Sequence, residues 1–286
     1  MARVTQAVHA VSLMGMEPIE WHTQGRSPRD VNEDAVVITA AHIAVIDGAT
    51  DIGDRRYQGM TPGRFAMETL RAALMVLPAD IAADAAIDHL SHVLFAAASA
   101  TGMRPDAHVR PTATIACYSA HHRQVWRVGD AYVRIGGFVS TPHTELDILA
   151  SGTRAAYDRA MIALGTPLAE IEVHDPGREV VLPILRLQTR FQNDPADFAE
   201  FGRGTIDGRH VPTRFRETWT VHPGTEVVLS TDGYPSPAPT LAQAEAELAE
   251  LLVRDPLRID RAHPGTKGRR PGQASFDDRA YVRLRA

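Results

Sequence analysis

The stretch that decides the fold begins with NED at residues 32–34 and ends with AHIAVIDG at residues 41–48. The apolar, β-branched run before Asp47 is typical of a buried strand. A carboxylate at the mouth of such a strand is costly to bury unless a cation or a hydrogen-bond network receives it. The stretch therefore indicates a metal site. The alternative is that the Asp-Gly pair only closes a hairpin turn, and the rest of the chain has to decide between the two.

The composition indicates a globular protein. The chain has 286 residues, of which 44% are hydrophobic, and this is enough to fill a substantial core. The 35 acidic and 30 basic residues give a formal net charge of −5 without a basic block, which disfavours nucleic-acid binding. The one cysteine, Cys117, excludes an intramolecular disulfide and a cysteine-rich zinc site. We expect it to be a small core residue within a strand.

The sequence indicates neither export nor membrane insertion. Residues 1–7 alternate like a strand and lack the apolar segment of a signal peptide. No apolar run reaches the roughly eighteen residues needed to span a bilayer. Together with the single cysteine, which fits a reducing compartment, these features predict a cytoplasmic protein.

Periodicity and turn residues predict a chain in which strands alternate with helices. Strands are expected at residues 4–13, 36–38, 43–46, 114–118, 125–128, 132–135, 180–187, 219–221, 226–230 and 280–284. Helices are expected at about 61–77, 80–100, 151–164 and 240–253, the first beginning with an N-cap threonine and a proline. We predict a single domain over residues 1–286 with a flap-like insertion at about 188–213, where the sequence becomes irregular.

Carboxylates stand at the edge of a predicted strand in four separate places: residues 32–34, Asp47, Asp232 and residues 277–278. Any one of them can be explained as turn chemistry. Four together are hard to explain in this way, because like charges that converge without a counter-ion repel strongly. Oxygen ligands without cysteine or histidine clusters favour hard ions such as Mg²⁺ or Mn²⁺.

The spaced motifs are RDVNED at 29–34, IAVIDG at 43–48, VGD at 128–130, LSTDG at 229–233 and DD at 277–278. In this order the set resembles the metal-dependent protein phosphatases of the PP2C type, in a divergent bacterial form, and it covers nearly the whole chain. The resemblance implies an α+β fold, a four-layer α-β-β-α sandwich of two antiparallel sheets flanked by helices. It also implies a binuclear metal centre in a cleft at one edge of the sandwich.

The same resemblance implies which residues would hold the metals. Asp47 would bridge two Mg²⁺ or Mn²⁺ ions, and Asp130 matches an acid associated with a third, weaker ion. Two such ions lie ~3.5–4 Å apart, lower the pKa of a shared water and neutralise charge during in-line attack on phosphorus. The implied metal ligands are Glu33, Asp34, Asp47, the carbonyl of Gly48, Asp130, Asp232 and Asp277.

Two cationic positions complete the predicted site. The resemblance implies that Arg29 acts with Asp47 in catalysis and binds the substrate, because a planar guanidinium can hold phosphoryl oxygens. Residues 266–270 are basic, and we predict Lys267 as a further substrate-binding residue for a phosphorylated or carboxylated group. The alternative for this segment is a solvated basic loop.

The chain departs from the family pattern beside the predicted ligands. Residues 49–51 read Ala-Thr-Asp where a Gly-Gly pair is usual, residues 131–132 read Ala-Tyr where Ser-Arg is common, and Ala280 stands where threonine is common. These changes leave the ligands in place and reshape the cleft. A haloacid-dehalogenase-type phosphatase is excluded, because Val45 occupies the place of that family's nucleophilic aspartate.

Three functions are compatible with the sequence. The first is a phosphoprotein Ser/Thr phosphatase, and the second is a phosphatase or related hydrolase of a small phosphorylated metabolite in the same metal cleft. The third is a non-catalytic binding or regulatory module of the same fold. The retained acids argue against the third, because a protein without metal chemistry has no need to hold so many costly carboxylates together.

Overall fold

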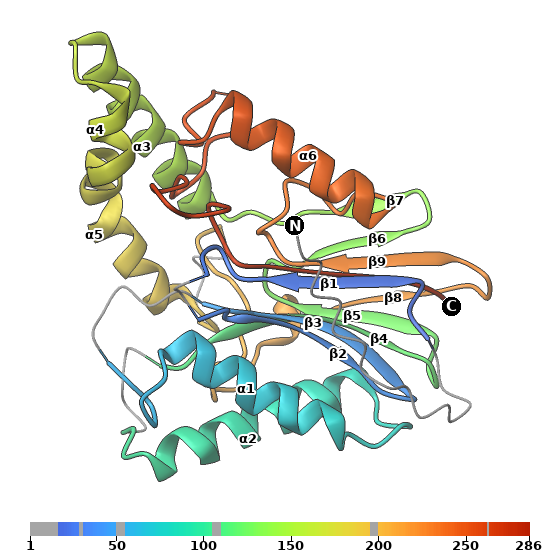
Figure 1. The fold of residues 1–286 in the computed structure, drawn as a ribbon. Coiled ribbons are helices and arrows are strands. Elements are labelled where there is room, and N and C mark those ends of the chain that lie inside the picture. Colours follow the sequence, from blue (N-terminus) through green and yellow to red (C-terminus); the bar gives the residue numbers. More distant parts are fainter. Residues whose placement is uncertain (1–16, 29–30, 50–54, 105–109, 195–199, 262) are drawn as a thin grey trace.

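The computed structural model describes residues 17–28, 31–49, 55–104, 110–194, 200–261 and 263–286 (Figure 1). The strand predicted at residues 4–13 lies outside the described residues. None of the helices in the described part of the chain is long and apolar enough to cross a lipid bilayer.

Two five-stranded sheets form the centre of the molecule, and all their strand pairs are antiparallel. The first sheet has the order β1 (Glu20–Gln24), β10 (Arg279–Arg285), β9 (Glu226–Ser230), β6 (Tyr132–Ile135) and β7 (Phe138–Ser140). The second sheet has the order β2 (Asp34–Ile38), β3 (His42–Gly48), β4 (Ala113–Ser119), β5 (Gln124–Val128) and β8 (Glu217–Thr220).

Helices cover the outer faces of both sheets (Figure 1). Helices α1 (Pro62–Met75) and α2 (Ala83–Ala100) share a core with the second sheet, and α6 (Leu241–Arg254) shares one with β9 and β10. A further core lies between the sheets and includes Val45, Leu229 and Val282. The predicted fold class, a four-layer α-β-β-α sandwich, is therefore confirmed.

Strand β3 explains why its sequence is apolar without a break. Ile43 and Val45 belong to the core between the sheets, whereas Ala44 and Ile46 belong to the core beneath α1 and α2. Side chains alternate along a strand, so both faces of β3 are buried. By the same alternation Asp47 lies on the side of β3 that faces the other sheet, at the end of the layer between the sheets.

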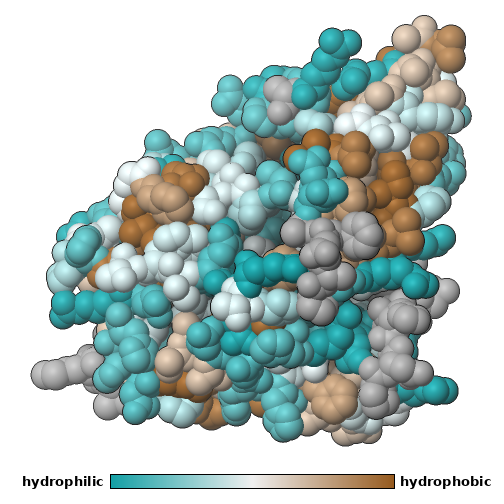
Figure 2. Space-filling model, turned by 180° about the vertical axis from the view of Figure 1, so that it is seen from behind, coloured by the Kyte–Doolittle hydropathy of each residue, from teal (hydrophilic) through white to brown (hydrophobic). Residues whose placement is uncertain are grey.

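Helices α3 (Glu145–Ala163), α4 (Leu168–His174) and α5 (Pro176–Phe191) project from one edge of the sandwich, at the left of Figure 1. We call them the helical arm. They carry several exposed large apolar side chains, and hydrophobic residues gather over the arm on the face shown in Figure 2. The exposed apolar residues of the arm are Ile148, Leu149, Tyr157, Leu168, Val173, Val180 and Leu187.

The strand predicted at residues 180–187 is wrong, because these residues belong to helix α5. The helix begins where the Asp175 side chain accepts a hydrogen bond from the backbone nitrogen of Arg178 (3.1 Å), with Pro176 in the first turn. Val181 and Leu185, one helical turn apart, are both buried with Ala150 of α3. The β-branched residues suggested a strand, but packing against α3 favours the helix.

Other boundaries also differ from expectation. Helix α3 begins at Glu145 rather than near residue 151, because Thr144 and Asp147 form a reciprocal capping box. Strands β1 and β7 and helix α4 were not predicted. The remaining predicted strands and helices within the described residues are confirmed, and Cys117 is a buried residue of β4 whose thiol pKa is raised by burial.

The predicted insertion at about 188–213 contains the end of α5 and an irregular segment. Within this segment Thr205, Ile206 and Asp207 are buried. Ile206 and Ala113 exchange two backbone hydrogen bonds (2.9 and 3.0 Å), which fix the segment beside the start of β4. This position brings Arg203 toward the end of the sheets at which Asp47 lies.

Candidate metal centre

The strand register brings the predicted acidic ligands to one end of the sandwich. Asp34, the first residue of β2, pairs directly with Asp47 of β3, and paired residues in antiparallel strands point to the same face. Asp232 follows β9 and Asp277 precedes β10, and these two strands pair with each other. Asp130 lies in the turn between β5 and β6. Both sheets therefore contribute carboxylates to the same edge.

These five residues interact electrostatically, and we call them the acidic cluster: Asp34, Asp47, Asp130, Asp232 and Asp277. Burial, with the nearby charges of Asp130 and Asp277, raises the pKa of Asp232 to about 7. Burial and the neighbouring carboxylates also raise the pKa values of Asp34 and Asp47 well above 3.8. Desolvation and like charge both disfavour the ionised form, and at these three residues they outweigh the nearby positive charges.

One oxygen of the cluster is left without a hydrogen bond. Among the described residues, the buried Oδ2 of Asp34 has no hydrogen-bond partner. A buried polar atom without a partner is costly, and native proteins satisfy nearly all such atoms with protein, water or an ion. The oxygen therefore points to a polar or ionic partner at this place.

Two glycines allow the loops of the cluster to pack tightly. A Cβ atom on Gly48 would lie 2.5 Å from the carbonyl oxygen of Gly63, at the start of α1. A Cβ atom on Gly233 would lie 1.9 Å from the carbonyl oxygen of Asp278. Only glycine fits at either position, which gives the Asp-Gly pairs at 47–48 and 232–233 a physical reason beyond turn formation.

Glu33 and Asp278 lie beside the acidic cluster and brace it. Asp278 accepts hydrogen bonds from the backbone nitrogens of Arg26 (2.7 Å) and Glu33 (2.8 Å). The carboxylate of Glu33 accepts a hydrogen bond from the hydroxyl of Thr61, the N-cap of α1. Burial raises the pKa of Glu33. Glu33 is thus close to the predicted ligands but is tied to the helix.

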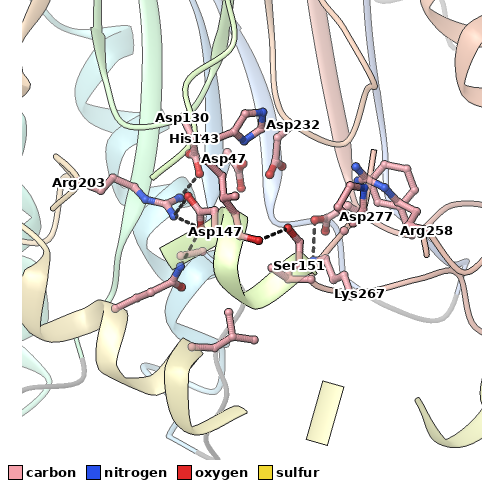
Figure 3. Close-up of a pocket in the computed structure, with 18 of the residues that line it drawn as sticks. Asp47, Asp130, His143, Asp147, Ser151, Arg203, Asp232, Arg258, Lys267 and Asp277 are labelled. Carbon is pink, nitrogen blue, oxygen red and sulfur yellow. Dashed lines mark hydrogen bonds and ion pairs between the residues drawn. The ribbon is translucent and has the colours of Figure 1, made fainter. Parts of the chain in front are cut away.

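Arginine 203 supplies a positive charge within the cluster (Figure 3). Its guanidinium forms ion pairs with Asp130 and with Asp147, the latter through both carboxylate oxygens (2.7 and 2.9 Å). Asp147 also accepts hydrogen bonds from Thr144 (2.9 Å) and Gln188 (2.7 Å). Although burial raises the pKa of Asp147, these partners lower it overall. Asp130 is therefore charge-compensated in the observed arrangement.

The predicted substrate residue Lys267 is also paired. Its Nζ lies 2.6 Å from Oδ2 of Asp277 (Figure 3). The basic segment 266–270 is accordingly not a freely solvated loop at this position, and the lysine charge is largely balanced by the cluster. Arg29, the other predicted substrate residue, lies outside the described residues.

A cleft of about 1450 Å³ opens over the acidic cluster. Asp47, Asp130, Asp232 and Asp277 line it, together with parts of the helical arm and of the loop after α6. Its walls carry many basic residues and also the acids Asp147, Glu247 and Glu250. Besides Arg203 and Lys267, the basic residues that line it include Arg178, Arg186, Arg190, Arg258 and Arg261.

The donor chemistry of the cluster fits a divalent cation. Carboxylate and carbonyl oxygens are the ligands that Mg²⁺ and Mn²⁺ prefer, and an ion would add positive charge to the cluster and give Oδ2 of Asp34 a partner. In the described part of the chain, no three histidine, cysteine or acidic side chains converge on one point. Binding an ion would therefore need rotation of carboxylates within the cluster.

The sequence did not reveal Arg203, Asp147 and Arg258 as residues of the cleft. Arg203 lies in a glycine-rich stretch that resembles any flexible loop, and its partners Asp147 and Asp130 are 56 and 73 residues away. Asp147 could have been noticed as the N3 acid of a capping box, but that role gives no hint of an ion pair.

No protein-family model matches the sequence, and no curated protein matches it. The structure aligns with the serine/threonine phosphatase PstP/Ppp of Mycobacterium tuberculosis over 93% of this chain and 97% of that one, with 16% identity and a TM-score of 0.46. The alignment with the catalytic domain of PstP in complex with two manganese ions covers 93% of this chain and 96% of that one, with 17% identity and a TM-score of 0.46. The alignment with the serine/threonine phosphatase Stp1 of Staphylococcus aureus covers 98% of this chain and 99% of that one, with 12% identity and a TM-score of 0.47. The solved structures named here are thus of serine/threonine phosphatases.

Proposed function

We propose that this protein is a Mg²⁺- or Mn²⁺-dependent phosphomonoester hydrolase with a binuclear metal centre. The observation that carries the proposal is the acidic cluster itself: five carboxylates from the strand ends and turns of both sheets, of which only Asp130 and Asp277 form ion pairs within the described residues, on the floor of a large cleft. A cluster of this kind destabilises the folded chain unless it serves to bind a cation. The sequence motifs support the same assignment.

In this proposal the residues of the chain have distinct tasks. Asp34, Asp47 and Asp232 hold the ions, with the carbonyl of Gly48 as a neutral ligand, while Asp278 and Thr61 fix Glu33 at the rim. Bound ions supply a nucleophile at neutral pH and neutralise developing phosphoryl charge. Arg29 holds the phosphoryl oxygens.

We propose phosphorylated protein side chains as the substrates. Pockets for small ligands commonly enclose about 300–1,000 Å³, and the cleft of about 1450 Å³ is larger. Its basic walls would favour an anionic substrate. A comparison of kcat/KM on phosphopeptides with kcat/KM on a panel of phosphorylated metabolites tests this choice, and a clear preference for one metabolite would contradict it.

The activity is tested by hydrolysis of an aryl phosphate in the presence of Mn²⁺, with EDTA as the metal-free condition. Asp47→Asn and Asp232→Asn are expected to lower kcat/KM by at least about 100-fold, because each removes a ligand and charge from the centre. Asp80→Asn is the matched control, since Asp80 is exposed between α1 and α2. Wild-type protein without Mn²⁺-dependent hydrolysis, or ligand variants as fast as wild type, would refute the proposal.

A further inference from the structure

The loop that follows α6, residues 255–261 and 263–267, is held in a defined shape on the wall of the cleft. The carboxylate of Asp255 accepts hydrogen bonds from the backbone nitrogens of Ile259 (3.0 Å) and Asp260 (2.8 Å). The backbone nitrogen of Gly265 donates to the carbonyl of Arg258 (2.9 Å). We call this segment the α6 loop.

A buried arginine of the helical arm anchors the same loop. The side chain of Arg154 on α3 is fully buried and pairs with Asp175 through two hydrogen bonds (2.8 and 3.0 Å). Its Nη1 also donates to the carbonyl oxygens of Leu257 (2.9 Å), which precedes Arg258, and of Gly265 (3.0 Å), which is hydrogen-bonded to Arg258. A buried arginine that makes this many hydrogen bonds fixes the backbone positions of its acceptors. Arg258 is therefore presented on a rigid support.

The side chain of Arg258 is positioned with little freedom. Its Cζ lies 4.2 Å from the centre of the Phe276 ring, and its buried Nε has no hydrogen-bond partner. A Cβ on Gly265 would lie 3.0 Å from that Nε, so a side chain at this position would press against the guanidinium. The residue itself has a φ of 53°, a backbone conformation that is uncommon for arginine.

Arg258 differs from Lys267 and Arg203, the paired cations of the cleft, in its charge balance. Lys267 is paired with Asp277, and Arg203 with Asp130 and Asp147. Among the described residues, no carboxylate lies within ion-pair distance of Arg258. Figure 3 places Arg203 and Arg258 on opposite sides of Asp47 and Asp232. The charge of Arg258 acts on Asp232, so it lies near the acidic cluster.

We propose that Arg258 binds the phosphoryl group of the substrate on the α6 side of the acidic cluster. The inference rests on the proposed function and deepens it, because it assigns a second phosphate-binding cation in addition to Arg29. A guanidinium that faces the cleft and has no carboxylate partner among the described residues can donate two parallel hydrogen bonds to phosphate oxygens. The rigid support from Arg154 and Phe276 lowers the entropic cost of binding.

The test measures the affinity of inorganic phosphate for the full chain by calorimetry in the presence of Mg²⁺. Arg258→Gln is expected to weaken phosphate binding by about 10- to 100-fold, as for loss of a charge-assisted hydrogen bond. Arg258→Lys should fall between wild type and Arg258→Gln, because it keeps the charge and loses the fork. Arg270→Gln, an exposed residue outside the cleft lining, is the matched control with the same charge change and should bind like wild type.

The outcomes separate this inference from the proposed function. If wild type hydrolyses aryl phosphate and Arg258→Gln binds phosphate as tightly as wild type, the role of Arg258 is refuted while the hydrolase stands. Equal weakening in Arg270→Gln would also refute it, since the effect would then be one of net charge. If wild type binds phosphate but hydrolyses nothing, the hydrolase fails and loss of binding in Arg258→Gln still supports the anion site. Should Arg258→Gln not fold, Arg258→Lys decides by the same comparison.

Discussion

Asp232 combines deep burial with the charges of Asp130 and Asp277, which together raise its pKa from 3.8 to about 7. The folded chain therefore keeps a proton that the unfolded chain releases between these two values. The metal-free protein is accordingly expected to lose stability as the pH rises through this window. The melting temperature of EDTA-treated protein, followed from about pH 5 to 8, measures the effect.

Asp232→Asn provides the control for this pH dependence. It removes one of the titrating groups, while Asp34 and Asp47 remain, so the decline of the melting temperature should become shallower and the variant should be more stable than wild type at the alkaline end. Asp80→Asn should retain the wild-type slope, because Asp80 is exposed. A wild-type melting temperature that does not change with pH would contradict the prediction.

Arg203 makes a second prediction at this scale. Arg203→Gln leaves Asp130 and Asp147 without their shared cation. These pairs are only partly buried, so we expect a loss between the less than about 1 kcal/mol of a surface pair and the about 3–5 kcal/mol of a buried one. Chemical denaturation of EDTA-treated protein measures this loss. Mn²⁺ should restore more stability in the variant than in wild type, because the released carboxylate of Asp130 can take part in binding the ion.

The control for Arg203 is Arg285→Gln. Arg285 pairs with Glu226 at the surface, where such a pair contributes less than about 1 kcal/mol. Similar small losses in both variants, or a response to Mn²⁺ that does not differ from wild type, would count against a special role for Arg203.

The acids of the candidate site and one of its cations, Lys267, could be predicted from the sequence, but Arg203 and Arg258 could not. Asp47 and Asp232 each follow an apolar run and precede a glycine, and this local pattern marks them. Arg203 and Arg258 carry no local pattern, since their positions depend on contacts with distant segments of the chain. Lys267 was predicted to bind substrate, and this role stays a prediction, although its ion pair with Asp277 now limits it.

At the scale of elements, the start of α1 links a helix to the candidate site. The hydroxyl of Thr61 accepts a hydrogen bond from the backbone nitrogen of Arg64 (3.3 Å) and donates one to Glu33. Thr61→Ala should lower the free energy of unfolding by about 1–2 kcal/mol, through loss of the cap and of the partner of a buried carboxylate. Urea denaturation measures this value.

Thr61→Ser keeps the hydroxyl and is the matched variant for Thr61→Ala. It should remain within about 0.5 kcal/mol of wild type, because serine caps helices as well as threonine does. If Thr61→Ser were as unstable as Thr61→Ala, the hydroxyl would not be the cause, and the contact between α1 and Glu33 would lose its support.

The strands and most helices could be predicted because their signals are local. The hairpin of β2 and β3 and the caps of α1 and α6 follow from runs of apolar residues and from single capping residues. Helix α5 could not be predicted in this way, because its β-branched residues and Pro183 favour other structures. Its helical form depends on α3, which buries Val181 and Leu185, and no local pattern contains that information.

At the scale of the whole molecule, Arg154 connects the helical arm with the α6 loop. Arg154→Met removes a buried ion pair with Asp175 and the donor of hydrogen bonds to three backbone carbonyls of the α6 loop. We expect the free energy of unfolding to fall by about 3–5 kcal/mol. Hydrogen exchange should become faster both in the arm and in the α6 loop. Faster exchange in the arm alone would contradict the proposed connection.

The exposed residue Arg71 on α1 is the control for Arg154. Arg71→Gln loses only a surface pair with Glu68, and it should change stability by less than about 1 kcal/mol without altering exchange in the α6 loop. If Arg154→Met were equally mild, the buried network would not be the element that holds these segments together.

The Arg154 network also limits how this protein can be redesigned. Because the helical arm projects from the edge of the sandwich, a chimera could be designed by exchanging the arm alone for that of another protein (Figure 1). The unit to be exchanged also includes the α6 loop, because the carbonyls of Leu257 and Gly265 accept hydrogen bonds from Arg154 of α3. A chimera that exchanges residues 144–191 alone should therefore misplace the wall of the cleft, and a viable one has to transplant both segments together.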